Sequence, residues 1–72
     1  MNTHEKLNLL EETMGLKSDV LKEADVLSSY DEWDSLAALS LMSIIGSKFH
    51  KRVTPIDVKQ LRTVADALNL ME

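Results

Sequence analysis

The sequence predicts an all-α fold, a small four-helix bundle with three main helices, one short helix and a long first loop. Apolar residues recur at helical spacing in three stretches, helix start and stop residues flank those stretches, and strand patterns are sparse. The 72 residues are expected to form a single domain over 1–72, because this length is near the lower limit for a chain with one core.

The first predicted helix begins at Thr3, a good N-cap residue, and ends at Gly15. Leu7, Leu10 and Met14 fall on one face of this helix and are expected to enter the core. Its acidic residues are expected to stay in water: Glu5, Glu11 and Glu12.

A long connection over residues 16–33 follows the first helix. Ser18 is predicted to cap one short turn, with Val20 and Leu21 facing inward, and Leu27 is predicted to anchor the loop in the core. Connections this long in compact domains usually carry function or local structure.

Asp34 is the predicted N-cap of a second helix over about residues 35–50. The residues expected on its inner side are Ala38, Leu39, Met42, Ile45 and Phe49, widened by Leu41 and Ile44. A helix this apolar on most sides is central or presents apolar surface to a partner. The cations at its C-terminal end, Lys48, Lys51 and Arg52, complement the helix dipole, and we do not interpret them as a ligand site.

The C-terminal third of the chain predicts two further helices. Thr54 and Pro55 start a short helix that ends at about Gln60. Thr63 and Asp66 form a variant capping box for the last helix. The apolar positions of that helix fall at helical spacing: Val64, Leu68 and Met71, with Ala65 beside Leu68.

Composition and charge argue against several classes of function. The net charge of −4 disfavours a nucleic-acid partner, because binding of the phosphate backbone requires a basic face. The longest stretch without a charge, Ser35 to Ser47, is too short and too polar to span a bilayer. The N-terminal stretch MNTHEKLNLL has no signal-peptide pattern, so the cytoplasm is the expected compartment.

The residue types needed for catalysis are also sparse. The chain has no cysteine, two histidines without metal-site spacing, and two isolated glycines that cannot form a phosphate-binding loop. The many carboxylates are expected on solvated faces, where their pKa values are not driven apart. We therefore predict no catalytic residue and no metal site, and a protein that is not an enzyme.

Ser35 is the one residue whose position favours a chemical role. It lies in the first turn of the second helix, beside backbone N–H groups without an intrahelical partner, so a phosphate ester on its oxygen would face the positive end of the helix dipole. The neighbouring charge of Asp34 opposes this effect in part. The simpler interpretation is that Asp34 and Ser35 only initiate the helix.

The sequence Asp34-Ser35-Leu36, which opens an apolar helix after a long first loop, resembles the attachment motif of acyl carrier proteins. The resemblance covers nearly the whole chain. The length of the chain, its acidic balance and its predicted helix order also match that family. Further stretches match in position: Met14-Gly15-Leu16, Phe49, Val53-Thr54-Pro55 and Thr63-Val64-Ala65-Asp66.

This resemblance implies a function. In that family a phosphopantetheinyl transferase moves 4′-phosphopantetheine from coenzyme A to the serine, and the thiol of this arm carries acyl or aminoacyl groups as thioesters. Ser35 would be the attachment residue, flanked by Asp34 and Leu36, and the other partners would be enzymes that load and process the acyl group. The resemblance also implies a monomer, and a Leu/Ile/Met interior suits shelter of an acyl chain between helices.

Two departures from the family pattern stand out. Glu32 replaces the usual glycine and Trp33 replaces a smaller residue; we interpret Trp33 as a packing residue, and the alternative is that it borders the arm and helps select partners. The second helix also lacks the family's acidic residues, with uncharged residues at the matching positions: Ala37, Ser40, Gly46 and Ser47. The predicted partner surface is apolar and hydroxyl-bearing, formed by Leu36, Ala37, Ser40 and Ile44, which implies a dedicated pathway with its own enzymes rather than general fatty-acid synthesis.

Two alternative functions remain open from the sequence. One is an unmodified helical module of carrier-like fold that binds a protein partner through apolar parts of the second helix. The other is a helix-turn-helix nucleic-acid binder, which rests only on the cations after that helix and is disfavoured by the acidic balance.

Overall fold

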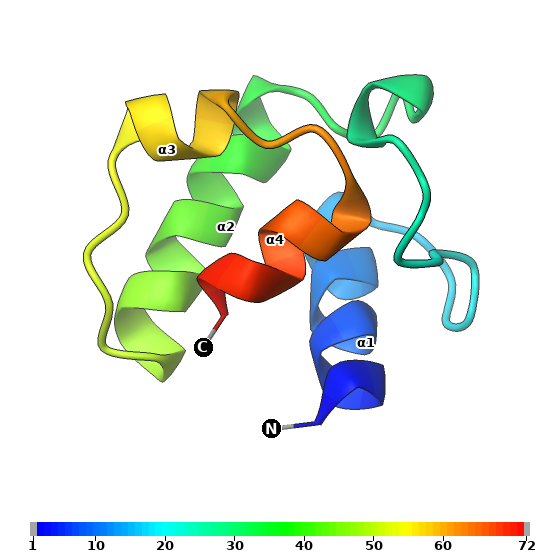
Figure 1. Cartoon of the computed structure of the whole chain (residues 1–72), viewed down its shortest axis with the longest axis horizontal. Coiled ribbons are helices and arrows are strands. Elements are labelled where there is room, and N and C mark those ends of the chain that lie inside the picture. Colours follow the sequence, from blue (N-terminus) through cyan, green and yellow to red (C-terminus); the bar gives the residue numbers. More distant parts are fainter. Residues whose placement is uncertain (1, 72) are drawn as a thin grey trace.

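The computed structural model of the protein describes residues 2–71 and confirms an all-helical fold. Its elements are α1 (Thr3–Met14), the 3₁₀ turn η1 (Leu27–Ser29), α2 (Ser35–Lys48), α3 (Pro55–Lys59) and α4 (Val64–Leu70). Figure 1 shows α4 lying across the space between α1 and α2, while α3 lies near the N-terminal end of α2. The prediction of four helices with a long first loop is therefore confirmed for residues 2–71, but α4, which was expected to be a main helix, has only seven residues and is close in length to α3.

Local capping sets both ends of α1. The N-cap is Asn2, whose side chain accepts a hydrogen bond from the Glu5 amide at 2.8 Å. The prediction that Thr3 is the N-cap was therefore wrong by one residue. Gly15 ends the helix as predicted, with a left-handed φ of 77° that favours glycine. The Leu16 amide then donates to the carbonyl of Glu11 at 2.8 Å and completes the end of the helix.

Helix α2 begins where the sequence predicted, with an Asp34 oxygen accepting from the Ala37 amide at 2.9 Å. Its buried face consists of Ala37, Leu41 and Ile45, three residues spaced four apart. The prediction that Leu39 faces the core was wrong, because its side chain is 59% exposed. The helix is apolar on most sides, so periodicity alone did not identify the side that packs against α1.

Both short C-terminal helices have the predicted start residues. The Thr54 hydroxyl accepts from the Asp57 amide and the Asp57 carboxylate accepts from the Thr54 amide, at 3.2 and 3.0 Å. Thr63 and Asp66 repeat this reciprocal arrangement at the start of α4. The capping boxes therefore place α3 and α4 at the predicted positions.

The long first loop is held against the start of α4. The Leu27 amide donates to the Arg62 carbonyl at 2.9 Å, and the Val64 amide donates to the Asp25 carbonyl at 2.9 Å. The Ala65 amide donates to the Glu23 carbonyl at 3.0 Å, so loop carbonyls satisfy amides that a helix start leaves without partners. The buried Leu27 is the anchor that the sequence predicted.

The first part of this loop departs from prediction. A turn lies at Ser18 and Asp19, and Leu21 is buried as predicted, but Val20, which was expected to face inward, is 41% exposed. Glu11, expected in water, is only 1% exposed. One of its carboxylate oxygens accepts from the amides of Val20 and Leu21 at 2.7 and 2.8 Å, which accounts for a buried charge on the inner side of α1.

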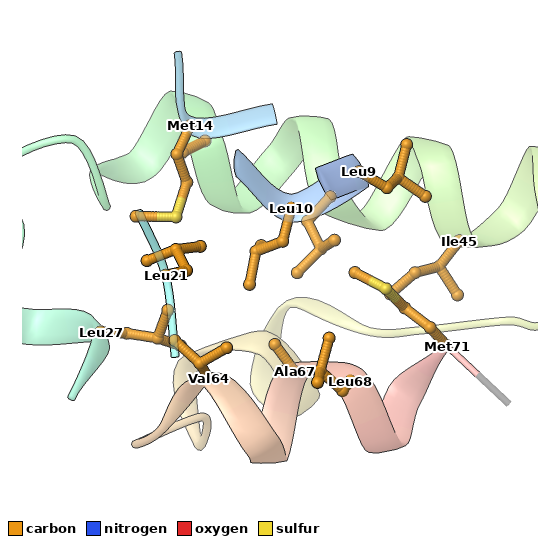
Figure 2. Packing of buried hydrophobic residues seen from close by; sticks show 12 residues of the cluster. Leu9, Leu10, Met14, Leu21, Leu27, Ile45, Val64, Ala67, Leu68 and Met71 are labelled. Atoms are coloured by element: carbon orange, nitrogen blue, oxygen red, sulfur yellow. The ribbon is translucent and has the colours of Figure 1, made fainter. Parts of the chain in front are cut away.

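The core lies where α1, α2, α4 and the first loop meet. Figure 2 shows Leu10 of α1 facing Val64 and Ala67 of α4, with Leu21 and Leu27 of the loop closing one end. The buried apolar residues that form this cluster are Leu9, Leu10, Met14, Leu21, Leu27, Ala37, Leu41, Ile45, Val64, Ala67, Leu68 and Met71. Helix α3 contributes the buried Val58 beside α2, outside this cluster.

Candidate functional site

Ser35 is the first residue of α2, and its side chain is exposed. It lies on the rim of a groove of about 440 Å³ between the N-terminal half of α2 and α3. The residues that line this groove are Trp33, Asp34, Ser35, Ala38, Leu39, Met42, Pro55, Val58 and Lys59. The sequence-predicted attachment residue therefore opens directly into a hollow of small-ligand size.

The groove combines an apolar wall with a polar rim. Ala38, Leu39 and Met42 contribute one wall from α2, and Pro55 and Val58 contribute the other from α3. The charged rim residues are Asp34 and Lys59. Such a surface suits a hydrocarbon or another uncharged chain, with polar groups near the Ser35 hydroxyl.

The electrostatic surroundings of Ser35 have two opposing parts. The amides of Ser35 and Leu36 belong to the first turn of α2, where the helix supplies no acceptor for them, and they favour an anion. Asp34 caps the Ala37 amide, and the exposed Asp31 and Glu32 add negative charge nearby. A phosphodiester, which carries a single negative charge, would feel both effects.

The predicted partner-binding residues do not form one surface. Leu36 is 72% exposed, whereas Ser40 and Ile44 are half-buried along a shallow hollow between α1 and α2. Trp33 lies on the α3 side of the helix instead. The expectation that Ala37 is on the outer surface was wrong, because Ala37 shares the buried face with Leu41 and Ile45.

Sequence reasoning missed most of the groove lining. Leu39 was assigned to the core, and Pro55 was noted only for starting α3. The sequence signal that could have found the groove was a second apolar side of α2, formed by Ala38, Leu39 and Met42. In the structure Leu39 is exposed on this side, and the other two are half-buried. The opposite wall belongs to a different helix, so no local sequence pattern placed it there.

Neither a metal site nor a membrane-spanning helix is present in the described part of the chain. Residues 2–71 contain no group of three or more His, Cys, Asp or Glu side chains placed to hold a metal ion. No helix within these residues combines the length and apolar character needed to cross a bilayer.

Comparison with family models, with curated proteins and with solved structures gave no match to this chain. The motif at Ser35 and the geometry around it are therefore the features that bear on function.

Proposed function

We propose that this protein is a carrier that holds acyl or aminoacyl intermediates on a 4′-phosphopantetheine arm attached to Ser35. The observation that carries the proposal is the exposed Ser35 side chain at the first turn of α2, on the rim of an apolar groove. The Asp34-Ser35-Leu36 motif, which resembles the attachment motif of acyl carrier proteins, supports the same assignment.

The chain's own contribution is a rigid, accessible anchor. The Asp34 cap and the packing of Ala37, Leu41 and Ile45 fix the start of α2. Because Ser35 is exposed, a phosphopantetheinyl transferase can reach its oxygen, form the phosphodiester and release the nucleotide part of coenzyme A. When attached, the arm supplies a thiol that forms thioesters, and this cysteine-free chain has none of its own.

The partner enzymes are proposed to be dedicated to one pathway. The solvent-facing residues of α2 between Ser35 and Lys48 are uncharged, including Leu36, Ser43 and Ser47. Recognition by a row of charges along the helix is therefore weak, and apolar contact at Leu36 replaces it. A general fatty-acid ketosynthase and reductase should process acyl chains on this protein poorly; processing at the rate of their usual carrier would contradict dedicated partners.

The attachment is tested by mass. Purified protein is incubated with coenzyme A, magnesium and a broad-specificity phosphopantetheinyl transferase, and its intact mass is measured. The expected gain is one phosphopantetheine in the wild type and in Ser43→Ala, a matched exposed serine of α2, and none in Ser35→Ala. An unchanged wild-type mass with several such transferases would count against the proposal.

A second candidate is an unmodified interaction module that binds a protein through α2. The observation that favours it is Leu36, which is 72% exposed on a helix with few charges. This function predicts partner binding that survives Ser35→Ala and is lost in Leu36→Asp, together with no gain of mass in the transferase experiment. The carrier function instead predicts that Ser35→Ala abolishes both the transfer of phosphopantetheine and the acylation of the protein.

A further inference from the structure

A hollow with cations in its lining lies toward the C-terminal end of α2, and we call it the basic hollow. It has a volume of about 380 Å³ and is open to solvent. In Figure 1 the link between α2 and α3, residues 49–54, runs along the outer edge of the molecule. This link supplies four of the residues that line the hollow, which are Met42, Gly46, His50, Lys51, Arg52 and Val53. Cations that the sequence indicated only as complements of the helix dipole therefore line a concave surface.

Gly46 lines the basic hollow at a position where nothing requires glycine. Apart from the helix itself, a β-carbon there would have only the carbonyl oxygen of Lys51 within 4 Å, at 3.9 Å, which is an ordinary contact. The residue lies inside α2, where alanine is favoured over glycine. The missing side chain leaves open space on this side of the helix, and we interpret that space as the reason for glycine.

His50 shows the converse departure from helix preferences. Its φ of 52° lies in the left-handed region, directly after the C-cap Phe49, where glycine is the common residue. A residue with a side chain is strained in this conformation. Helix α2 thus has glycine where a side chain is favoured and a side chain where glycine is favoured, and both residues line the basic hollow.

The basic hollow is positive although the chain has a net charge of −4. None of its lining residues is acidic. The partial negative charge at the end of α2 is met by Lys48 in the last turn. Asp57 is the carboxyl group whose pKa is lowered by hydrogen bonds from Thr54 and, to a smaller extent, by the charge of Lys51. The charge of Arg52 therefore has no comparable compensation and is available to an anionic group.

We propose that the basic hollow docks an acidic segment of a protein partner. Arg52 and Lys51 attract the carboxylates of such a segment, and Met42 and Val53 contact the methylene stems. An acidic segment that protrudes fits a concave surface, whereas a flat anionic membrane does not enter it. An extended anionic surface is also repelled by the carboxylates before Ser35, and a nucleic acid requires a wider basic face than two adjacent residues supply.

The basic hollow lies on the same side of α2 as Ser35. Gly46 follows Ser35 by eleven residues, which is about three turns and about 16 Å along the helix. Met42 lines both the basic hollow and the groove beside Ser35. A partner held at the basic hollow therefore extends toward Ser35. The docking itself does not depend on an arm attached to that residue.

The first test titrates the unmodified, ¹⁵N-labelled protein with a blocked peptide of alternating Glu and Ala and follows the amide chemical shifts. Saturating shifts are expected at Gly46 and at residues 50–53, and a Gln/Ala peptide of the same length should cause none. The absence of these shifts with the Glu/Ala peptide would overturn the proposal. Inorganic phosphate and vesicles of anionic phospholipid are compared at equal concentration of negative charge, and equal or tighter binding of either would overturn the choice of a protein partner.

The second test reverses one charge of the basic hollow. Arg52→Glu should lower the affinity for the Glu/Ala peptide about five- to ten-fold at low salt, because an attraction is replaced by a repulsion. Lys17→Glu, at an exposed residue of the first loop, changes the net charge equally and should keep the affinity near the wild-type value. Equal losses in the two variants would show a response to net charge alone and would overturn the proposal.

The third test uses Gly46, where stability and binding are expected to change in opposite directions. Gly46→Ala should raise Tm, since alanine is favoured in a helix and its β-carbon fits, yet it should weaken binding of the Glu/Ala peptide because the methyl group narrows the hollow. Gly46→Leu should weaken binding further, whereas Ser47→Leu, at the exposed neighbour outside the hollow, should not. A raised Tm with wild-type affinity in Gly46→Ala would overturn the role of the hollow, even where the leucine variant does not fold.

Discussion

Glu11 is the one charged residue that is buried among residues 2–71, with 1% of its surface exposed. One oxygen of its carboxylate accepts from the Val20 and Leu21 amides, and the other oxygen, Oε1, is buried without a hydrogen-bond partner among the described residues. A buried carboxylate is costly unless it satisfies other polar groups. Here it holds the start of the first loop against α1, at a place where the loop has no helix of its own.

Glu11→Ala should therefore destabilise the protein by about 2–3 kcal/mol, because the buried Leu21 amide loses its acceptor and removal of a buried side chain leaves a cavity. The measurement is the free energy of urea unfolding. Glu12→Ala, the exposed neighbour on α1, is the matched control and should change stability by less than about 0.5 kcal/mol. Equal effects of the two substitutions would show that the loop does not depend on Glu11.

Short helices depend on their caps more than long helices do. Helix α3 has five residues and α4 has seven, too few to be stable by propensity alone. The Asp66 carboxylate accepts from the amides of Thr63 and Arg62, both at 3.1 Å. The hydrogen bond from the Thr63 amide, followed by that from Arg62, lowers the pKa of Asp66 below its ordinary value.

The pKa of Asp57 is lowered in the same way by the Thr54 amide. The pKa of each carboxyl group is lower in the folded chain than in the unfolded chain. At pH values above the ordinary pKa of Asp, each ionised carboxylate therefore stabilises the fold. This stabilisation is lost as the pH falls through the pKa of the folded state. Unfolding free energy should therefore decrease from about pH 5 downward. In the double variant Asp57→Asn/Asp66→Asn, the unfolding free energy should decrease less steeply with falling pH. Asp31→Asn, outside both helices, is the control and should keep the wild-type slope. Parallel curves for the wild type and both variants would contradict this prediction.

The accuracy of the sequence predictions differed between local and non-local features of these elements. Caps are local, so Asp34, Thr54 and Thr63 placed three helix starts correctly from a few residues each. The buried side of α2 was mispredicted at Leu39 because an almost uniformly apolar helix has no single stripe. The position of Ser35 followed from its motif, but the groove beside it was not predictable, because its second wall comes from α3 across an intervening loop.

At the scale of the whole molecule, opposite charges gather at the two ends of α2. Exposed carboxylates lie just before Ser35, at Asp31, Glu32 and Asp34, and exposed cations follow the other end, at Lys48, Lys51 and Arg52. The 14 residues of the helix separate these groups by about 21 Å, more than a Debye length at physiological salt. A partner that approaches Ser35 therefore meets these three carboxylates and Lys59 of the adjoining groove, largely independently of the cations at the other end of α2.

If Ser35 is the attachment residue, as proposed, this charge arrangement predicts that the phosphopantetheinyl transferase docks with a basic surface and that its kcat/KM falls as salt rises. Glu32→Lys should lower kcat/KM several-fold at low salt and flatten the salt dependence, because a repulsive charge then lies three residues from the reacting hydroxyl. Glu23→Lys changes the net charge equally, but it lies twelve residues before Ser35, at a loop segment whose carbonyl accepts from α4. It should leave both quantities near their wild-type values. Equal losses in the two variants would mean that the transferase responds to net charge, and no loss in either would mean that apolar contact around Leu36 governs docking.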